Sequence, residues 1–149
     1  MNNKVYFIGL LSLLLIVILL LVTGSDILLI EIGKGSSIPL GTFITWIGMI
    51  AFPCAIYFGS NRLREPKSRF YFFLSVILKG LIVVAIMWVP VSYFLAGNIA
   101  FTFSEKETFR GGQLAMRWFW IYSYSVAVGP ILFLLVYWIS MFLKTNKSF

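Results

Sequence analysis

Four long apolar stretches dominate the sequence and constrain what the chain can fold into. They cover residues 5–23, 40–59, 70–95 and 118–143. As a helix rising 1.5 Å per residue, each is long enough to cross about 30 Å of hydrocarbon. In lipid, only a helix satisfies the backbone N–H and C=O groups within its own segment. The sequence therefore predicts four transmembrane helices.

Composition supports the same fold class. Hydrophobic residues make up 60% of the 149 residues and charged residues 11%, so few polar side chains are available to cover a water-facing surface. A soluble enzyme, a disordered chain and a disulfide scaffold are excluded. We expect an all-α integral membrane protein that forms a single four-span membrane domain over residues 1–149.

The first apolar stretch has some features of a secretory signal peptide, because Lys4 precedes it and Thr23-Gly24-Ser25 follows it. Its apolar core of about 17 to 18 residues is longer than the 7–15 residues that are typical of a cleaved signal. We therefore expect a retained transmembrane helix.

The basic residues predict the orientation in the membrane. The chain has 12 Lys+Arg and 5 Asp+Glu, and the basic residues gather before the first span, in the loop 60–69 and after the fourth span. The positive-inside rule places both termini and this loop in the cytoplasm, and we expect the bacterial inner membrane. The same charges could also bind an anionic cytosolic partner, or they could serve only to set the topology. Direct binding of nucleic acid is disfavoured. The candidate contacts for a cytosolic partner are Arg62, Arg64, Lys67, Arg69, Lys144 and Lys147.

Two predicted outer loops, residues 24–39 and 96–117, are long for a four-helix protein. The first contains an apolar run at 27–32 that is too short to span, and residues 99–103 alternate as in a strand. A capping box at 104–107 predicts a short helix that ends at Gly111-Gly112. These features favour a small outer cap, or runs that dip separately into the lipid interface. The charged residues of the predicted cap are Asp26, Glu31, Glu105, Glu107 and Arg110.

Lys79 is the one charge well inside a predicted span. An ionisable residue within the membrane indicates a functional site. The alternative is that Lys79 snorkels, since its long stem can carry the ammonium group toward water.

Small residues recur on the second and fourth spans at spacings of three to four residues. Such faces let helix backbones approach closely, within one chain or between the subunits of a homo-oligomer. The first span offers little more than Gly9, so we expect it to face lipid. The candidate packing residues are Gly48, Ala51, Ala55, Gly59, Ser125 and Gly129. Prolines occur at Pro53, Pro90 and Pro130, and a fixed bend in each helix is favoured over a moving gate.

Residue types argue against catalysis. The chain has no histidine and a single cysteine, Cys54, so Ser-His and Cys-His nucleophiles and histidine-ligated metals are excluded. No pattern pairs the carboxylates of the outer loops into an acid–base site. We expect a non-enzymatic protein with no catalytic residue, metal or cofactor.

Four short spans, both termini inside and no catalytic residues give a layout that resembles the membrane subunit of Kiwa-type bacterial antiphage systems. The resemblance covers the size and layout of the whole chain. It implies an oligomeric sensor that couples an event at the envelope to a cytosolic, DNA-binding effector.

Two other hypotheses remain open. A small, basic, multi-span protein with Phe52-Pro53 ahead of a charged loop is similar to immunity proteins against pore-forming colicins, which bind the toxin within the bilayer. A small oligomeric channel would instead place Lys79 and the small-residue faces around a pore.

Overall fold

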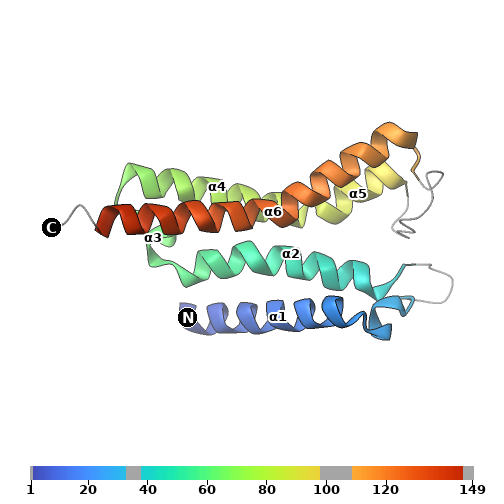
Figure 1. The fold of residues 1–149 in the computed structure, drawn as a ribbon, viewed down its shortest axis with the longest axis horizontal. Coiled ribbons are helices and arrows are strands. Elements are labelled where there is room, and N and C mark those ends of the chain that lie inside the picture. The colour runs from blue at the N-terminus through green and yellow to red at the C-terminus, as the bar shows by residue number, and fades with distance from the viewer. Residues whose placement is uncertain (1, 33–37, 98–108, 146–149) are drawn as a thin grey trace.

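The computed structural model describes residues 2–32, 38–97 and 109–145, and the regular elements in these ranges are all helices. Figure 1 shows an elongated bundle in which the start of α1, the turn α3 and the end of α6 lie at one end, here named the basic end. The opposite end is named the loop end. The elements are α1 (Asn3–Thr23), η1 (Asp26–Leu29), α2 (Leu40–Gly59), α3 (Asn61–Arg64), α4 (Arg69–Ile86), α5 (Trp88–Ala96) and α6 (Gly112–Thr145).

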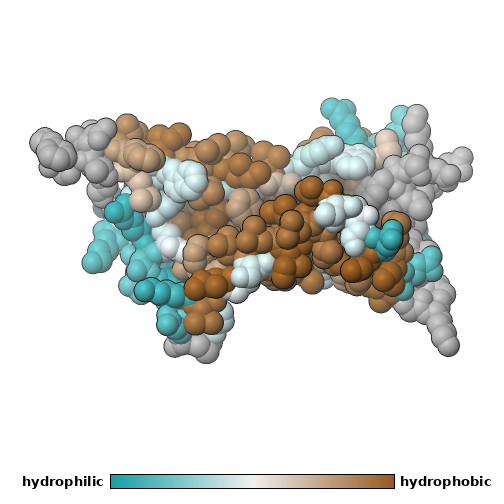
Figure 2. Space-filling model, turned by 60° about the horizontal axis from the view of Figure 1, so that its bottom comes forward, coloured by the Kyte–Doolittle hydropathy of each residue, from teal (hydrophilic) through white to brown (hydrophobic). Residues whose placement is uncertain are grey.

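The prediction of an all-helical chain with four membrane-spanning segments is confirmed at the level of length and hydropathy. In the described part of the chain, four helices are long and apolar enough to cross a membrane: Asn3–Thr23, Leu40–Gly59, Arg69–Ile86 and Gly112–Leu143. Figure 2 shows apolar side chains over the middle of the viewed face and hydrophilic residues toward both ends.

The third span is not one continuous helix over 70–95. It divides at Met87 into α4 and α5. Pro90 has no N–H, so the Ile86 carbonyl loses its usual helical donor. The indole N–H of Trp46 on α2 donates to the Ala85 and Ile86 carbonyls, at 3.1 Å each. A side chain from another helix therefore compensates for the bond that Pro90 removes.

The fourth helix begins at Gly112 rather than at residue 118, because its first turns are already packed. Ala115 and Phe119 are buried, and Phe109 lies just ahead of the helix in the same core cluster. Gly112 has φ +61°, a conformation that favours glycine at the turn into the helix. The strand-like run 99–103 and the capping box 104–107 lie outside the described residues.

Two core clusters are formed by the described residues. The loop-end core joins the end of α4 with α5 and α6 and contains Ala85, Trp88, Val89, Ala96, Phe109, Ala115, Phe119 and Val126. The basic-end core joins α2, α3, α4 and α6 and contains Ile56, Leu63, Tyr71, Leu74, Leu78, Phe133 and Tyr137. Helix α1 contributes to neither cluster, and it lies at the edge of the bundle against α2 (Figure 1).

Candidate functional site

The predicted cytoplasmic loop 60–69 contains the helical turn α3, which carries Arg62 and Arg64 and is here named the basic turn. Leu63 is fully buried in the basic-end core beneath this turn. At the junction of α2 and α3, the hydroxyl groups of Ser60 and Tyr137 form a buried hydrogen bond of 2.6 Å. Because Tyr137 belongs to α6, this bond and the burial of Leu63 tie the basic turn to the transmembrane helices.

Arg64 closes the end of α2. Its guanidinium donates to the Phe58 carbonyl at 3.1 Å and also to the side-chain oxygen of Asn61. The carbonyls in the last turn of a helix have no partner within the helix, so a basic side chain there stabilises the helix end. The structure therefore gives Arg64 a local structural role beside the partner contact that its charge predicted.

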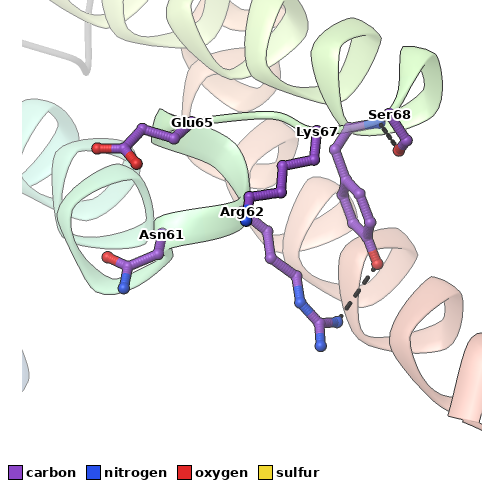
Figure 3. Close-up of a pocket in the computed structure, with 6 residues that line it drawn as sticks. Asn61, Arg62, Glu65, Lys67 and Ser68 are labelled. Carbon is purple, nitrogen blue, oxygen red and sulfur yellow. Dashed lines mark hydrogen bonds between the residues drawn. The ribbon is translucent and has the colours of Figure 1, made fainter.

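Arg62 borders a cavity of about 530 Å³ beside the turn. Its guanidinium donates to the Tyr71 hydroxyl at 3.4 Å and lies 5.8 Å from the centre of that ring (Figure 3). Tyr71 is buried, so its ring is held by packing and its hydroxyl fixes the position of the Arg62 guanidinium. This basic-turn pocket is lined by Asn61, Arg62, Glu65, Lys67, Ser68 and Tyr71.

The other predicted partner contacts differ in what the structure shows of them. Lys67 lines the basic-turn pocket, and Arg69 begins α4 just beyond it; both side chains are exposed. Lys144 lies in the last turn of α6, although its side chain is outside the described part of the chain, as is the whole of Lys147. The structure thus brings Arg62 and Lys67 together at one pocket.

Lys79 lies ten residues into α4 from Arg69, about 15 Å along the helix. Side chains on a helix tilt toward its N-terminus, which for α4 is the basic end. The Lys79 ammonium lies 6.0 Å from the centre of the Tyr57 ring, in the last turn of α2. Lys79 is exposed on the bundle and is directed toward the basic end, a geometry that favours snorkelling.

The small residues of α2 pack against α1 within the chain. A methyl group on Gly48 would lie 2.6 Å from Cγ1 of Val17, and one on Gly59 would lie 2.8 Å from the Phe7 ring. Ala51 and Ala55 are buried between these glycines.

The short stripe of α6 behaves differently. Gly129 faces α4, and a methyl group on it would lie 3.0 Å from Cδ2 of Leu81. The exposed Ser125 instead donates to the Ile121 carbonyl of its own helix at 2.7 Å. On α1, a methyl group on Gly9 would meet no atom within 4 Å.

An apolar groove runs between α1 and α6 over the floor of α2. Three adjoining cavities of about 480, 390 and 430 Å³ form it from the loop end to the basic end. They share lining residues: Thr45 and Met49 border the first two, and Leu14 and Phe52 border the second and third. The groove therefore follows α2 along its length.

The predicted outer-cap residues are only partly described. Asp26 begins η1, and Glu31 forms an isolated bridge with Pro39; both are exposed. The Arg110 side chain lies beside Gly97, and the backbone N–H of Arg110 donates to the Ala96 carbonyl at 3.4 Å. Glu105 and Glu107 lie outside the described residues. Among the residues that are described, no three His, Cys, Asp or Glu side chains are grouped to hold a metal ion.

Sequence reasoning missed the aromatic side chains that make polar bonds inside the spans. The Trp46 indole donates to the Ala85 carbonyl at the break in the third span. Tyr122 donates to the Val84 carbonyl at 2.6 Å, and Trp88 donates to the Ser123 hydroxyl at 2.9 Å. One signal was present: Pro90 leaves the carbonyl four residues earlier without a donor, and tryptophan and tyrosine are the bulky apolar residues that carry one.

Comparisons with known proteins do not assign the chain to a family. No protein-family model, curated protein or solved structure matches it.

Proposed function

We propose that this protein is a non-enzymatic sensor and anchor of the bacterial inner membrane, which couples an event at the loop end to a cytosolic protein held at the basic end. In this proposal the basic end faces the cytoplasm, as the positive-inside rule requires. Antiphage defence is the setting that the overall layout suggests, and the working form is a homo-oligomer.

The observation that carries the proposal is the bond between Ser60 and Tyr137. It joins the basic turn to α6, a helix of 34 residues that continues to the loop end. A shift of α6 would therefore act directly on the surface that carries Arg62 and Lys67. A loop that served only as a topology signal would need neither the buried Leu63 nor this hydrogen bond.

Affinity capture from native membranes tests the partner. The wild-type protein is expected to retain a cytosolic protein, and the double variant Lys67→Gln/Arg69→Gln is expected to lose most of it. Lys4→Gln, which removes an exposed cation of α1 outside the turn, is the matched control and should retain the partner. A reporter fused to the C-terminus verifies that orientation is unchanged. Equal recovery from all three proteins would contradict the proposal.

An immunity function is the second candidate, and the groove between α1 and α6 favours it. A groove that follows α2, about 30 Å long, matches the length of a toxin helix inserted in the bilayer. Expression in cells exposed to the product of a neighbouring toxin gene tests this candidate. Protection that Met49→Trp abolishes, by filling the groove, would favour immunity. Toxin killing equal to that of cells without the protein would exclude it.

A further inference from the structure

We infer that the basic-turn pocket binds the phosphate group of an anionic phospholipid. This site goes beyond the proposed sensor function, because it requires neither a protein partner nor a signal. The inference is carried by the side chains that line the pocket, by its level in the bundle and by the apolar surface beside it.

The pocket is rich in hydrogen-bond donors. Arg62 and Lys67 supply two cations, and Arg62 is held in place by the Tyr71 hydroxyl. The Ser68 oxygen accepts from the backbone N–H of Tyr71, which leaves the hydroxyl hydrogen for a ligand. The Asn61 side-chain oxygen accepts from Arg64, so its NH₂ group is likewise left to donate. Guanidinium, ammonium, hydroxyl and amide donors together suit a phosphate oxygen cluster.

Glu65 is the acidic residue of the pocket, and its position leaves the cations available. Its carboxylate is directed away from the Arg62 guanidinium (Figure 3). Within the described ranges, no ion pair joins Glu65 to Arg62 or Lys67. The pocket therefore keeps a net positive charge on the side where Arg62 and Tyr71 meet.

The level of the pocket favours a lipid over a soluble phosphate. It lies between the last residue of α2 and the first turn of α4, where both helices leave their apolar lengths. The same turn of α4 exposes Phe70, Phe72 and Phe73, at 50%, 61% and 62% of their surface. Exposed phenylalanines would lie among acyl chains while the cations reach the headgroup, and basic pockets at this boundary recognise anionic headgroups.

Native mass spectrometry of the purified, detergent-solubilised protein tests the inference, with dioleoyl phosphatidylglycerol as the probe and the zwitterionic dioleoyl phosphatidylcholine for comparison. A basic residue that contacts an anionic headgroup strengthens its binding by about fivefold. Lys67→Gln and Arg62→Gln are each expected to weaken phosphatidylglycerol binding by about that factor. Arg69→Gln is the matched control, because Arg69 is an exposed cation of the same loop that does not line the pocket. Salt screens an exposed charge that makes no direct contact, so this variant should change binding by less than about twofold.

Three outcomes decide the inference. Loss in the two pocket variants with retention in Arg69→Gln, and no displacement by sn-glycerol 3-phosphate, supports a lipid site. Displacement by millimolar sn-glycerol 3-phosphate would overturn the lipid assignment in favour of a soluble phosphate. Equal losses in Lys67→Gln and Arg69→Gln, or no loss in any variant, would overturn the site itself.

Two features keep this test clear of other effects. Lys67 is exposed, so its replacement leaves the fold intact, and the melting temperature of each variant verifies this. The assay contains no cytosolic protein, so a failed partner capture and a failed lipid titration are separate results.

Discussion

Helix α2 is held by its neighbours in two different ways. Toward α1 it presents glycines, with Gly48 against Val17 and Gly59 against Phe7, and no side-chain hydrogen bond joins the two helices among the described residues. Toward α4 and α5 it presents Trp46, whose indole binds carbonyls exposed by a helix break. One face depends on close approach and the other on a polar bond.

The difference shows that α1 and the α4–α5 pair associate with α2 through different interactions. Apolar surface gives little driving force there, so helices associate through dispersion contacts or through hydrogen bonds. Helix α1 has few buried side chains and no break, so close approach at glycine is its main means of attachment. Helices α4 and α5 contain an interrupted backbone, which a bond from outside can satisfy.

The largest expected effect comes from closing the gap at Gly48. Gly48→Leu should destabilise the docking of α1 on α2 by about 2 kcal/mol, because the added side chain overlaps Val17. Gly9→Leu is the control, since no atom lies within 4 Å of its methyl position. Thermal unfolding in detergent measures both. Equal stability of the two variants would show that the α1–α2 contact does not depend on close approach.

Removing the donor at Trp46 should have the next largest effect. Trp46→Phe keeps an aromatic ring but leaves the Ala85 and Ile86 carbonyls without the indole, which should destabilise the protein by about 1 kcal/mol. Pro90→Ala restores a backbone N–H for Ile86. In the Pro90→Ala background, the same Trp46→Phe change should therefore cost less. A double-mutant cycle measures this coupling, and strict additivity would contradict it.

A smaller effect is expected at the basic end. Tyr137→Phe removes the bond to Ser60 and should destabilise the protein by about 0.6 kcal/mol, the average for a hydrogen bond between membrane helices. Tyr124→Phe is the matched control on the same helix, because the Tyr124 side chain is 63% exposed. Chemical unfolding in detergent compares the two. A larger loss in the control would contradict a role for the Ser60–Tyr137 bond.

The smallest effect is expected at Lys79. Lys79→Met keeps the length of the stem and removes an exposed charge, so stability should change by less than about 0.5 kcal/mol. The unfolding transition measures this change. A loss above about 2 kcal/mol would indicate that Lys79 forms a buried contact in an oligomer rather than snorkelling.

Hydropathy was enough to predict the four spans, because a membrane requires length and apolarity that few other structures need. The break at Met87 was not predicted, although Pro90 was noted, because its position depends on Trp46, a residue 40 positions away from Ile86. The small residues of α2 were predicted to pack against a helix, but the sequence did not show that this helix is α1. The spacing of glycines carries no information about which helix lies opposite.

The sequence predicted that basic residues gather at the candidate site, but it did not predict how their side chains are arranged there. The basic residues at 62, 64, 67 and 69 form one group in the sequence. The fold separates them, because Arg64 caps α2 while Arg62 turns to Tyr71. That division depends on the helical turn α3. A four-residue turn between two long helices has too short a pattern to be predicted from the sequence.

The unequal lengths of α1 and α6 have a consequence for the surrounding bilayer. Helix α1 has 21 residues, about 32 Å along its axis, whereas the apolar part of α6, residues 118–143, has 26 residues and a length of about 39 Å. A hydrocarbon layer of about 30 Å matches the first and falls short of the second. The protein therefore meets the membrane with a perimeter of uneven thickness. Tilt, local thickening of the lipid or a neighbouring subunit along α6 would relieve the mismatch, so the stability of the protein should depend on the thickness of the bilayer.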